Sequence, residues 1–200
     1  MRTITTVLTA LILASISVAT SRAQVDQGWL RMWQEAQTHR PAVLATSGRL
    51  AGPAEPGAPL VLRGHLKEPD GRTPAAGAIV FGYQTDRDGI YYNAERPGQP
   101  WRLQGWARTN DDGSFEFRTV RPGSYPGRQI PAHIHLSVET RDFGRQWTDE
   151  IRFDDDAFVT ADERARSRAA GAFGPVRPVT VREGVQYVDL TIRLKARADF

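Results

Sequence analysis

The 200-residue chain contains no cysteine. Disulfide bonds, thiolate metal sites and cysteine nucleophiles are therefore excluded, and any bound metal ion must be held by nitrogen and oxygen donors. The sequence also lacks a G-x-S-x-G nucleophile elbow, a P-loop and a Rossmann fingerprint, so it offers no motif for acyl-enzyme or nucleotide chemistry. With 40% hydrophobic residues and ordinary charge content, the chain fits one globular domain with a proper core.

Long apolar runs are missing after the first segment of the chain. That segment combines Arg2, an apolar run over residues 7–14, and Ser21-Arg22-Ala23, which is a small-x-small cleavage pattern. The apolar run is too short to span a bilayer comfortably, which argues against a membrane anchor. We therefore expect residues 1–23 to be a signal peptide, and the mature protein to be secreted or periplasmic with no membrane span.

The sequence has little net charge. Its 26 basic and 23 acidic residues give +3, and removal of Arg2 and Arg22 with the signal peptide leaves 24 against 23, or +1. A nearly neutral mature protein gives no electrostatic reason to expect nucleic acid as a partner.

Short apolar runs separated by turn residues make up most of the mature sequence. Residues 25–36 have apolar side chains at helical spacing and predict a short helix that ends before Pro41, followed by a linker arm rich in Gly and Pro that ends at residue 59. Many short strands divided by turns are typical of a β-sandwich or barrel. The predicted strands are residues 60–66, 78–84, 103–109, 115–120, 132–138, 150–153 and 187–194, and residues 162–170 form a helix or an exposed excursion.

Two histidines, His133 and His135, alternate with apolar residues. Alternate side chains of a β-strand point to opposite faces, so both imidazoles would stand on one face while Ile134 and Leu136 face the core. Two imidazoles at this separation reach a single transition-metal ion, and they suit iron, copper, nickel and zinc alike. A lone histidine would more often be structural, but a pair on one strand face favours metal binding.

Tyrosines that follow turns complete a candidate metal site. Tyr125 follows the Pro122-Gly123 turn, and Tyr91 and Tyr92 follow a turn that ends at Gly89. A phenol keeps its proton up to a pKa of about 10, so only a strongly Lewis-acidic ion such as ferric iron holds a phenolate well. Two phenolates and one hydroxide would neutralise that ion, and a neutral complex is easier to bury. Either Tyr91 or Tyr92 can instead be a packing aromatic, and the Gly-x-Tyr spacing favours Tyr91 as the donor.

Several runs between residues 60 and 156 resemble, in the same order, the intradiol ring-cleavage dioxygenases, with the best match to a secreted form of the protocatechuate 3,4-dioxygenase branch. The resemblance implies an all-β fold, a β-sandwich of the intradiol dioxygenase type with a short N-terminal helix, so that residues 24–59 are helix and arm and residues 60–200 the sandwich domain. The runs are Leu62-Arg63-Gly64-His65-Leu66, residues 83–91, residues 108–126 and Pro131-Ala132-His133-Ile134-His135.

The resemblance also implies a non-haem Fe(III) site whose ligands are Tyr91, Tyr125, His133 and His135. In the family, the tyrosine that corresponds to Tyr91 stays bound, whereas the one that corresponds to Tyr125 leaves when substrate arrives. A catecholic substrate then chelates the iron, O2 attacks the substrate, and the ring opens to a muconate-type diacid; the iron acts as Lewis acid and template. Family members are often oligomers, so a homo-oligomer is expected by analogy.

The chain departs from the family pattern at two substrate-binding positions. The arginine that usually precedes Pro-Ala-His-Ile-His is replaced by Ile130, and Arg128 can take over its role only if the turn redirects it. A usual glutamine is replaced by Glu150. The retained ligands favour a dioxygenase that acts on a catecholic compound outside the cytoplasm. The lost arginine favours the alternative, a non-catalytic secreted β-sandwich module for binding or adhesion, because fold does not imply function.

Overall fold

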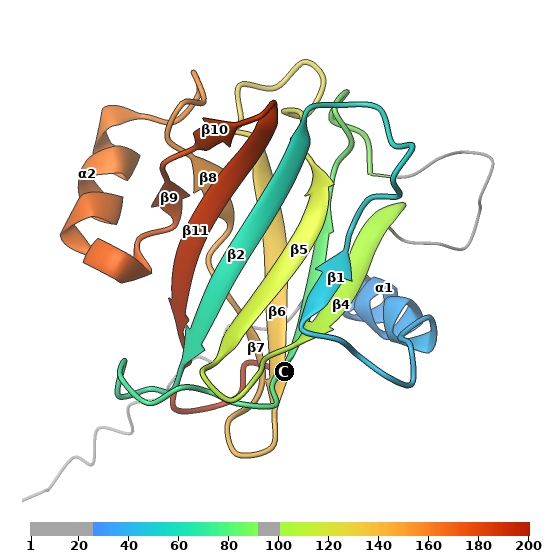
Figure 1. Ribbon diagram of the computed structural model, residues 1–200, viewed down its shortest axis with the longest axis vertical. Helices are drawn as coiled ribbons and strands as arrows, with labels where there is room; N and C mark the ends of the chain where they lie inside the picture. Colours follow the sequence, from blue (N-terminus) through green and yellow to red (C-terminus); the bar gives the residue numbers. More distant parts are fainter. Residues whose placement is uncertain (1–25, 92–100) are drawn as a thin grey trace, which may run out of the picture.

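Two β-sheets packed face to face dominate the computed structural model, which describes residues 26–91 and 101–200 (Figure 1). This arrangement confirms the predicted all-β sandwich. The predicted signal peptide, residues 1–23, and the alternative donor Tyr92 lie outside the described residues. No helix of the described ranges is long and apolar enough to cross a membrane.

The first sheet has the strand order β1-β5-β2-β11-β10, and the second has the order β4-β3-β6-β8-β9 with β7 paired to β6. The strands of the first sheet are β1 (Ser47–Arg49), β2 (Pro59–Lys67), β5 (Ser114–Val120), β10 (Thr180–Arg182) and β11 (Val185–Arg193). Those of the second are β3 (Ile79–Gln84), β4 (Leu103–Arg108), β6 (His133–Thr140), β7 (Gly144–Trp147), β8 (Ile151–Phe153) and β9 (Val176–Arg177). The helices are α1 (Gln27–Thr38), α2 (Ala161–Ala169) and the 3-10 turn η1 (Gly171–Phe173).

Every predicted strand is present, with ends that differ from the prediction by two residues or fewer, and the charged segment forms α2. Strands β1, β7, β9 and β10 were not predicted. Each of them spans only two to four residues. So short a run carries too little alternation to be recognised, and its pairing with neighbouring strands is what makes it a strand.

The space between the sheets is filled by one hydrophobic core. Ile134 and Leu136 of β6 point into it and meet side chains of the first sheet, among them the fully buried Phe117 of β5. Burial of each such side chain stabilises the fold by about 1.5–3 kcal/mol. Because β6 alternates, its other side chains, including His133 and His135, stand on the outer face of the second sheet. The predicted division between a core face and a face that carries both histidines is therefore present.

Helix α1 covers part of that outer face. Asp26 caps the helix by accepting hydrogen bonds from the backbone N–H groups of Gly28 and Trp29. Trp33 is buried, and its Nε1 donates to Ser137 Oγ on β6, at 3.1 Å. Ser137 is the next outward-facing residue after His135, so the helix packs beside the histidines. Trp33 therefore serves as a packing group between the helix and the sheet.

The segment expected to be a linker arm is partly built into the sandwich. Its first residues belong to β1, which pairs in parallel with β5, and Leu50 and Ala51 are buried. A Cβ on Gly48 would lie 2.3 Å from the backbone oxygen of Trp106, so glycine is needed for the chain to pass between the sheet edges. The glycine content that predicted a linker arm therefore serves close packing at this point.

Candidate metal centre

Four polar atoms converge beside the first residues of β6. The phenol oxygens of Tyr91 and Tyr125 are 2.6 Å apart, and the Nε2 atoms of His133 and His135 are 3.0 Å apart. Tyr91 Oη lies 2.9 Å from His135 Nε2, and Tyr125 Oη lies 3.1 Å from His133 Nε2. Metal bonds to nitrogen and oxygen are about 2.0–2.2 Å long, so adjacent donors on one ion are separated by about 3 Å. The four distances between neighbouring atoms of this group therefore fit donors that share a single ion.

The imidazole of His133 is oriented by the chain that precedes it. Its Nδ1 lies 2.7 Å from the backbone oxygen of Pro131. A carbonyl oxygen only accepts hydrogen bonds, so Nδ1 carries a proton and Nε2 is the nitrogen that faces the other three polar atoms. The backbone N–H of Ala132 donates to Asp156 Oδ2, at 3.0 Å, and so holds the start of the strand. The local backbone thus sets which nitrogen faces the centre.

The imidazole of His135 is held by a stack of aromatic rings. It lies 4.5 Å from the ring of Tyr83, with only 12° between the planes, and Tyr83 stacks in turn on Trp101 at 3.9 Å. Trp29 of α1 donates its Nε1 proton to Tyr83 Oη at 2.9 Å. Trp101 therefore packs behind the ring of Tyr83 and supports the site from there. Tyr83 had been given no role, and its strand register opposite His135 is the signal that identifies it.

The two tyrosine-bearing loops approach each other through glycines. Each tyrosine follows a glycine by two residues, Gly89 for Tyr91 and Gly123 for Tyr125. A Cβ on Gly89 would lie 2.0 Å from the backbone oxygen of Ser124, and one on Gly123 would lie 2.3 Å from a backbone oxygen of the other loop. Backbone contact at this distance is open only to glycine. The shared Gly-x-Tyr spacing is therefore what lets the two phenols meet.

Arg102 fixes the first tyrosine loop in place. Its backbone N–H donates to the backbone oxygen of Tyr91 at 2.8 Å, and its guanidinium binds Asp86 Oδ2 at 2.9 Å and Glu55 Oε1 at 2.8 Å. The backbone oxygen of Asp86 also accepts a hydrogen bond from the backbone N–H of Gly123, at 2.7 Å, and this bond joins the two loops. Sequence reasoning missed this group, because Glu55 comes from the segment expected to be a linker.

Burial keeps the phenols neutral when no cation is present. It raises the pKa of Tyr91, and the hydrogen bond with Tyr125 raises that pKa further. Burial also raises the pKa of Tyr125, while the hydrogen bond with Tyr91 and the positive charge of Arg128 lower that pKa less strongly. Burial, followed by the neighbouring His133, lowers the pKa of His135. A deprotonated phenol at this place therefore needs a strongly Lewis-acidic cation beside it, as the donor set suggests.

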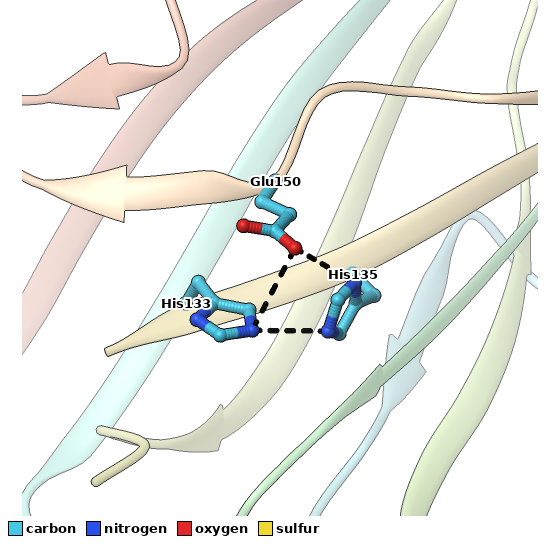
Figure 2. Close-up of side chains that lie close together, drawn as sticks. All are labelled: His133, His135 and Glu150. Atoms are coloured by element: carbon cyan, nitrogen blue, oxygen red, sulfur yellow. Dashed lines mark hydrogen bonds and ion pairs between the residues drawn. The ribbon is translucent and has the colours of Figure 1, made fainter. Parts of the chain in front are cut away.

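The carboxylate of Glu150 lies beside the two histidines on this face of the sheet (Figure 2), and a guanidinium pairs with it. Arg152 lies opposite His133 in the pairing of β6 with β8, and Glu150, two residues earlier, points to the same side. Arg152 Nη2 donates to Glu150 Oε2 at 2.8 Å. Burial raises the pKa of Glu150, but this hydrogen bond and the nearby histidines lower it by more, so the carboxyl group is charged.

Arg128 lies on the exposed side of the turn after Tyr125. Its backbone N–H donates to the backbone oxygen of Tyr125, at 3.0 Å, and its backbone oxygen accepts from Ser124 Oγ, at 3.2 Å. Among the described residues its guanidinium has no ion-pair partner. Its charge acts on the Tyr125 phenol from a distance, and its part in substrate binding stays a prediction.

Comparisons with known proteins agree with the fold. A family model described as dioxygenase matches residues 35–183. Catechol 1,2-dioxygenase 1 of Acinetobacter lwoffii is 30% identical over 150 residues, which are 66% of this chain and 46% of that protein. The solved structure of catechol 1,2-dioxygenase from Acinetobacter sp. ADP1, inhibited by bound mercury, covers 86% of this chain and 72% of its own, with a TM-score of 0.60 and 18% identity.

A second solved structure is the dioxygenase domain of a dioxygenase carbohydrate-binding protein fusion from Streptomyces sp. SirexAA-E. It covers 76% of this chain and 88% of its own, with a TM-score of 0.56 and 24% identity. The chain belongs to the intradiol ring-cleavage dioxygenase family. It spans about half the length of the curated relatives it matches.

Proposed function

We propose that this protein is a non-haem ferric dioxygenase that cleaves a catecholic ring between its two hydroxyl-bearing carbons. Both atoms of O2 enter the product, a muconate-type diacid. The observation that carries the proposal is the convergence of two phenol oxygens and two imidazole nitrogens, with 2.6–3.1 Å between neighbouring atoms. Membership of the family supports it, as does the similarity to proteins named as catechol 1,2-dioxygenases.

Ferric iron held by these four residues would supply the Lewis acidity that activates a chelated catechol toward O2. Tyr91 contacts both Tyr125 and His135, so it anchors the centre. Tyr125 would give up its place to the substrate and hold one of the substrate's hydroxyl protons at its phenol oxygen. Arg128, with its free charge on the exposed side of the Tyr125 loop, would steer the aromatic substrate as it enters.

The decisive experiment is oxygen uptake by iron-loaded protein with catechol, protocatechuate and hydroxyquinol in turn, with identification of the products. We expect one O2 consumed per ring opened and a muconate-type diacid. The iron-loaded protein should be red to burgundy from phenolate-to-iron charge transfer, and its colour should change when a catechol is added. Retention of coloured iron without turnover of any catechol would favour the non-catalytic binding module instead.

Matched variants test the individual ligands. Tyr125→Phe should change the colour and lower turnover by about 100-fold or more, since a proton-transfer group is lost, whereas Tyr187→Phe on the other sheet should change neither. His133→Ala should abolish iron retention, and His65→Ala, at an exposed position of β2, should not. A colourless protein with full iron content would contradict the tyrosine assignment. Full iron occupancy in His133→Ala would remove that residue from the ligand set.

We also propose that residues 1–23 direct export to the periplasm or the medium. N-terminal sequencing of the protein recovered from those compartments should begin at Gln24. Recovery of an uncleaved chain from the cytoplasm alone would contradict this.

A further inference from the structure

A negative charge stands next to the place where a ligand would replace Tyr125. Glu150 Oε1 lies 3.9 Å from His133 Nε2, and Tyr125 Oη lies 3.1 Å from the same nitrogen (Figure 2). Whatever their directions, the two oxygens are therefore no more than about 7 Å apart, which is less than the Debye length of about 8 Å at physiological ionic strength. The charge of Glu150 thus acts on any ligand that binds at this position.

The guanidinium beside Glu150 leaves no free positive charge there. Arg152 Nη2 donates to Glu150 Oε2 at 2.8 Å, and Arg152 Nη1 pairs with Glu163 in the first turn of α2. An ion pair with a guanidinium favours the charged form of a carboxylate, so both carboxylates are charged. One arginine therefore serves two acids, and this group keeps one negative charge in excess.

The arginine behind the first tyrosine loop shows the same excess. Arg102 binds the carboxylates of both Glu55 and Asp86, whose side chains are only 11% and 15% exposed. Arg128 has no ion-pair partner among the described residues, but it is exposed, and a solvated arginine pairs with an anion only weakly. Neither Arg102 nor Arg152 thus has charge to offer to an anionic ligand.

The backbone that joins the Tyr125 loop to β6 carries an apolar residue. The backbone oxygen of Ile130 accepts a hydrogen bond from Ser124 Oγ, next to Tyr125. Pro131, the following residue, binds Nδ1 of His133 through its own backbone oxygen at 2.7 Å. Ile130 is therefore fixed between the loop and the histidine strand, and it brings no charge to that position.

We propose that the substrate is a catechol whose ring substituent is neutral or positively charged, and that Glu150 disfavours catechols that carry a carboxylate. The inference rests on the proposed function and names its substrate class. A carboxylate on the ring would approach Glu150 with no buried cation to compensate it, and like charges at this separation repel each other. An ammonium substituent would be attracted by the same charge.

The first test compares ligands that differ only in the charge of one substituent. They are protocatechuate and the two catechols that carry a methyl or an aminoethyl group in place of its carboxylate. Calorimetry and the shift of the charge-transfer band give the Kd of each for iron-loaded protein, without O2 so that no turnover occurs. We expect protocatechuate to bind about ten-fold more weakly than the methylcatechol, and the aminoethylcatechol at least as tightly. Equal or tighter binding of protocatechuate would overturn the proposal.

The second test assigns the preference to Glu150. Glu150→Gln keeps the shape of the side chain and removes its charge, so the ratio of the protocatechuate Kd to the methylcatechol Kd should fall about five-fold. The ratio cancels any change in iron content or in the binding of the two hydroxyl groups. Glu139→Gln is the matched control, since Glu139 is a half-buried, ion-paired carboxylate at the far end of β6, and it should leave the ratio unchanged. An unchanged ratio in Glu150→Gln would contradict the proposal.

A gain of positive charge provides an independent variant. Ile130→Arg should also lower the ratio, whereas the neutral Ile130→Met should not, and this pair decides if Glu150→Gln does not fold, as judged by thermal unfolding. The failures are distinguishable. Iron-loaded protein that binds none of the three catechols would refute the proposed function together with the inference, whereas binding of all three without regard to charge would refute the inference alone.

Discussion

The contact between the two tyrosine-bearing loops predicts that Gly89→Ala disrupts the proposed metal centre. Gly89 has a φ of +83°, where an alanine costs about 1–2 kcal/mol. The new Cβ would also lie 2.0 Å from the backbone oxygen of Ser124, and relief of such overpacking costs about 1–3 kcal/mol. The total loss of stability is therefore about 2–5 kcal/mol. Because one loop must move, Tyr91 and Tyr125 would no longer meet at 2.6 Å.

Two further glycines separate these contributions. Gly77 has a φ of +68° with no atom within 4 Å of the added Cβ, so Gly77→Ala carries only the conformational penalty. Gly123 has no positive φ, but its Cβ would lie 2.3 Å from the backbone oxygen of Arg87, so Gly123→Ala carries only the steric one. Gly77 also lies just before β3, outside the two loops that carry Tyr91 and Tyr125. Its replacement should therefore leave the proposed metal centre intact.

Thermal unfolding and iron binding of the three variants provide the assay. For a protein of this size, a loss of 1 kcal/mol lowers Tm by about 2–4 °C. Gly77→Ala should lower Tm by a few degrees and leave the charge-transfer colour unchanged. Gly123→Ala and Gly89→Ala should bind iron weakly or lose the colour, with the larger loss of stability for Gly89→Ala. Gly89→Ala behaving like Gly77→Ala in both measurements would refute the argument that glycine contact positions the phenols.

Two further predictions concern the scaffold. Thr160→Ala removes the capping box that Thr160 forms with Glu163 at the start of α2. The free energy of unfolding should fall by about 1 kcal/mol, which lowers Tm without changing the colour. An unchanged Tm would show that the cap is dispensable. Phe117→Ala leaves a cavity between the sheets at a side chain with 0% exposure and should lower the free energy of unfolding by about 3–5 kcal/mol. Urea denaturation measures it, and a loss under about 1 kcal/mol would contradict the assigned core.

Much of the fold was predictable because its signals are local. Alternation of apolar residues and the turns between them located each of the longer strands, and the helical spacing located α1. Alternation also put His133 and His135 on one face, since side chains two residues apart on a strand always share a side. The same rule links Glu150 to Arg152, although the sequence alone showed only that Glu150 departs from the family pattern.

What the sequence left undetermined depends on contacts between distant segments. The two phenols come from loops 34 residues apart, and the Arg102 group draws on a segment that composition had marked as a linker. Tyr83 and Trp101 support His135 through the register of neighbouring strands.

The sequence by itself therefore determined the sandwich and the placing of both histidines on one strand face, and it indicated the tyrosines as candidate donors, because each of these signals lies in neighbouring residues. Only the tertiary structure decided that the phenols meet the imidazoles at one point and that a carboxylate faces them. Those distances depend on how closely the loops pack, and no local pattern records the separation of segments that meet only after the chain has folded.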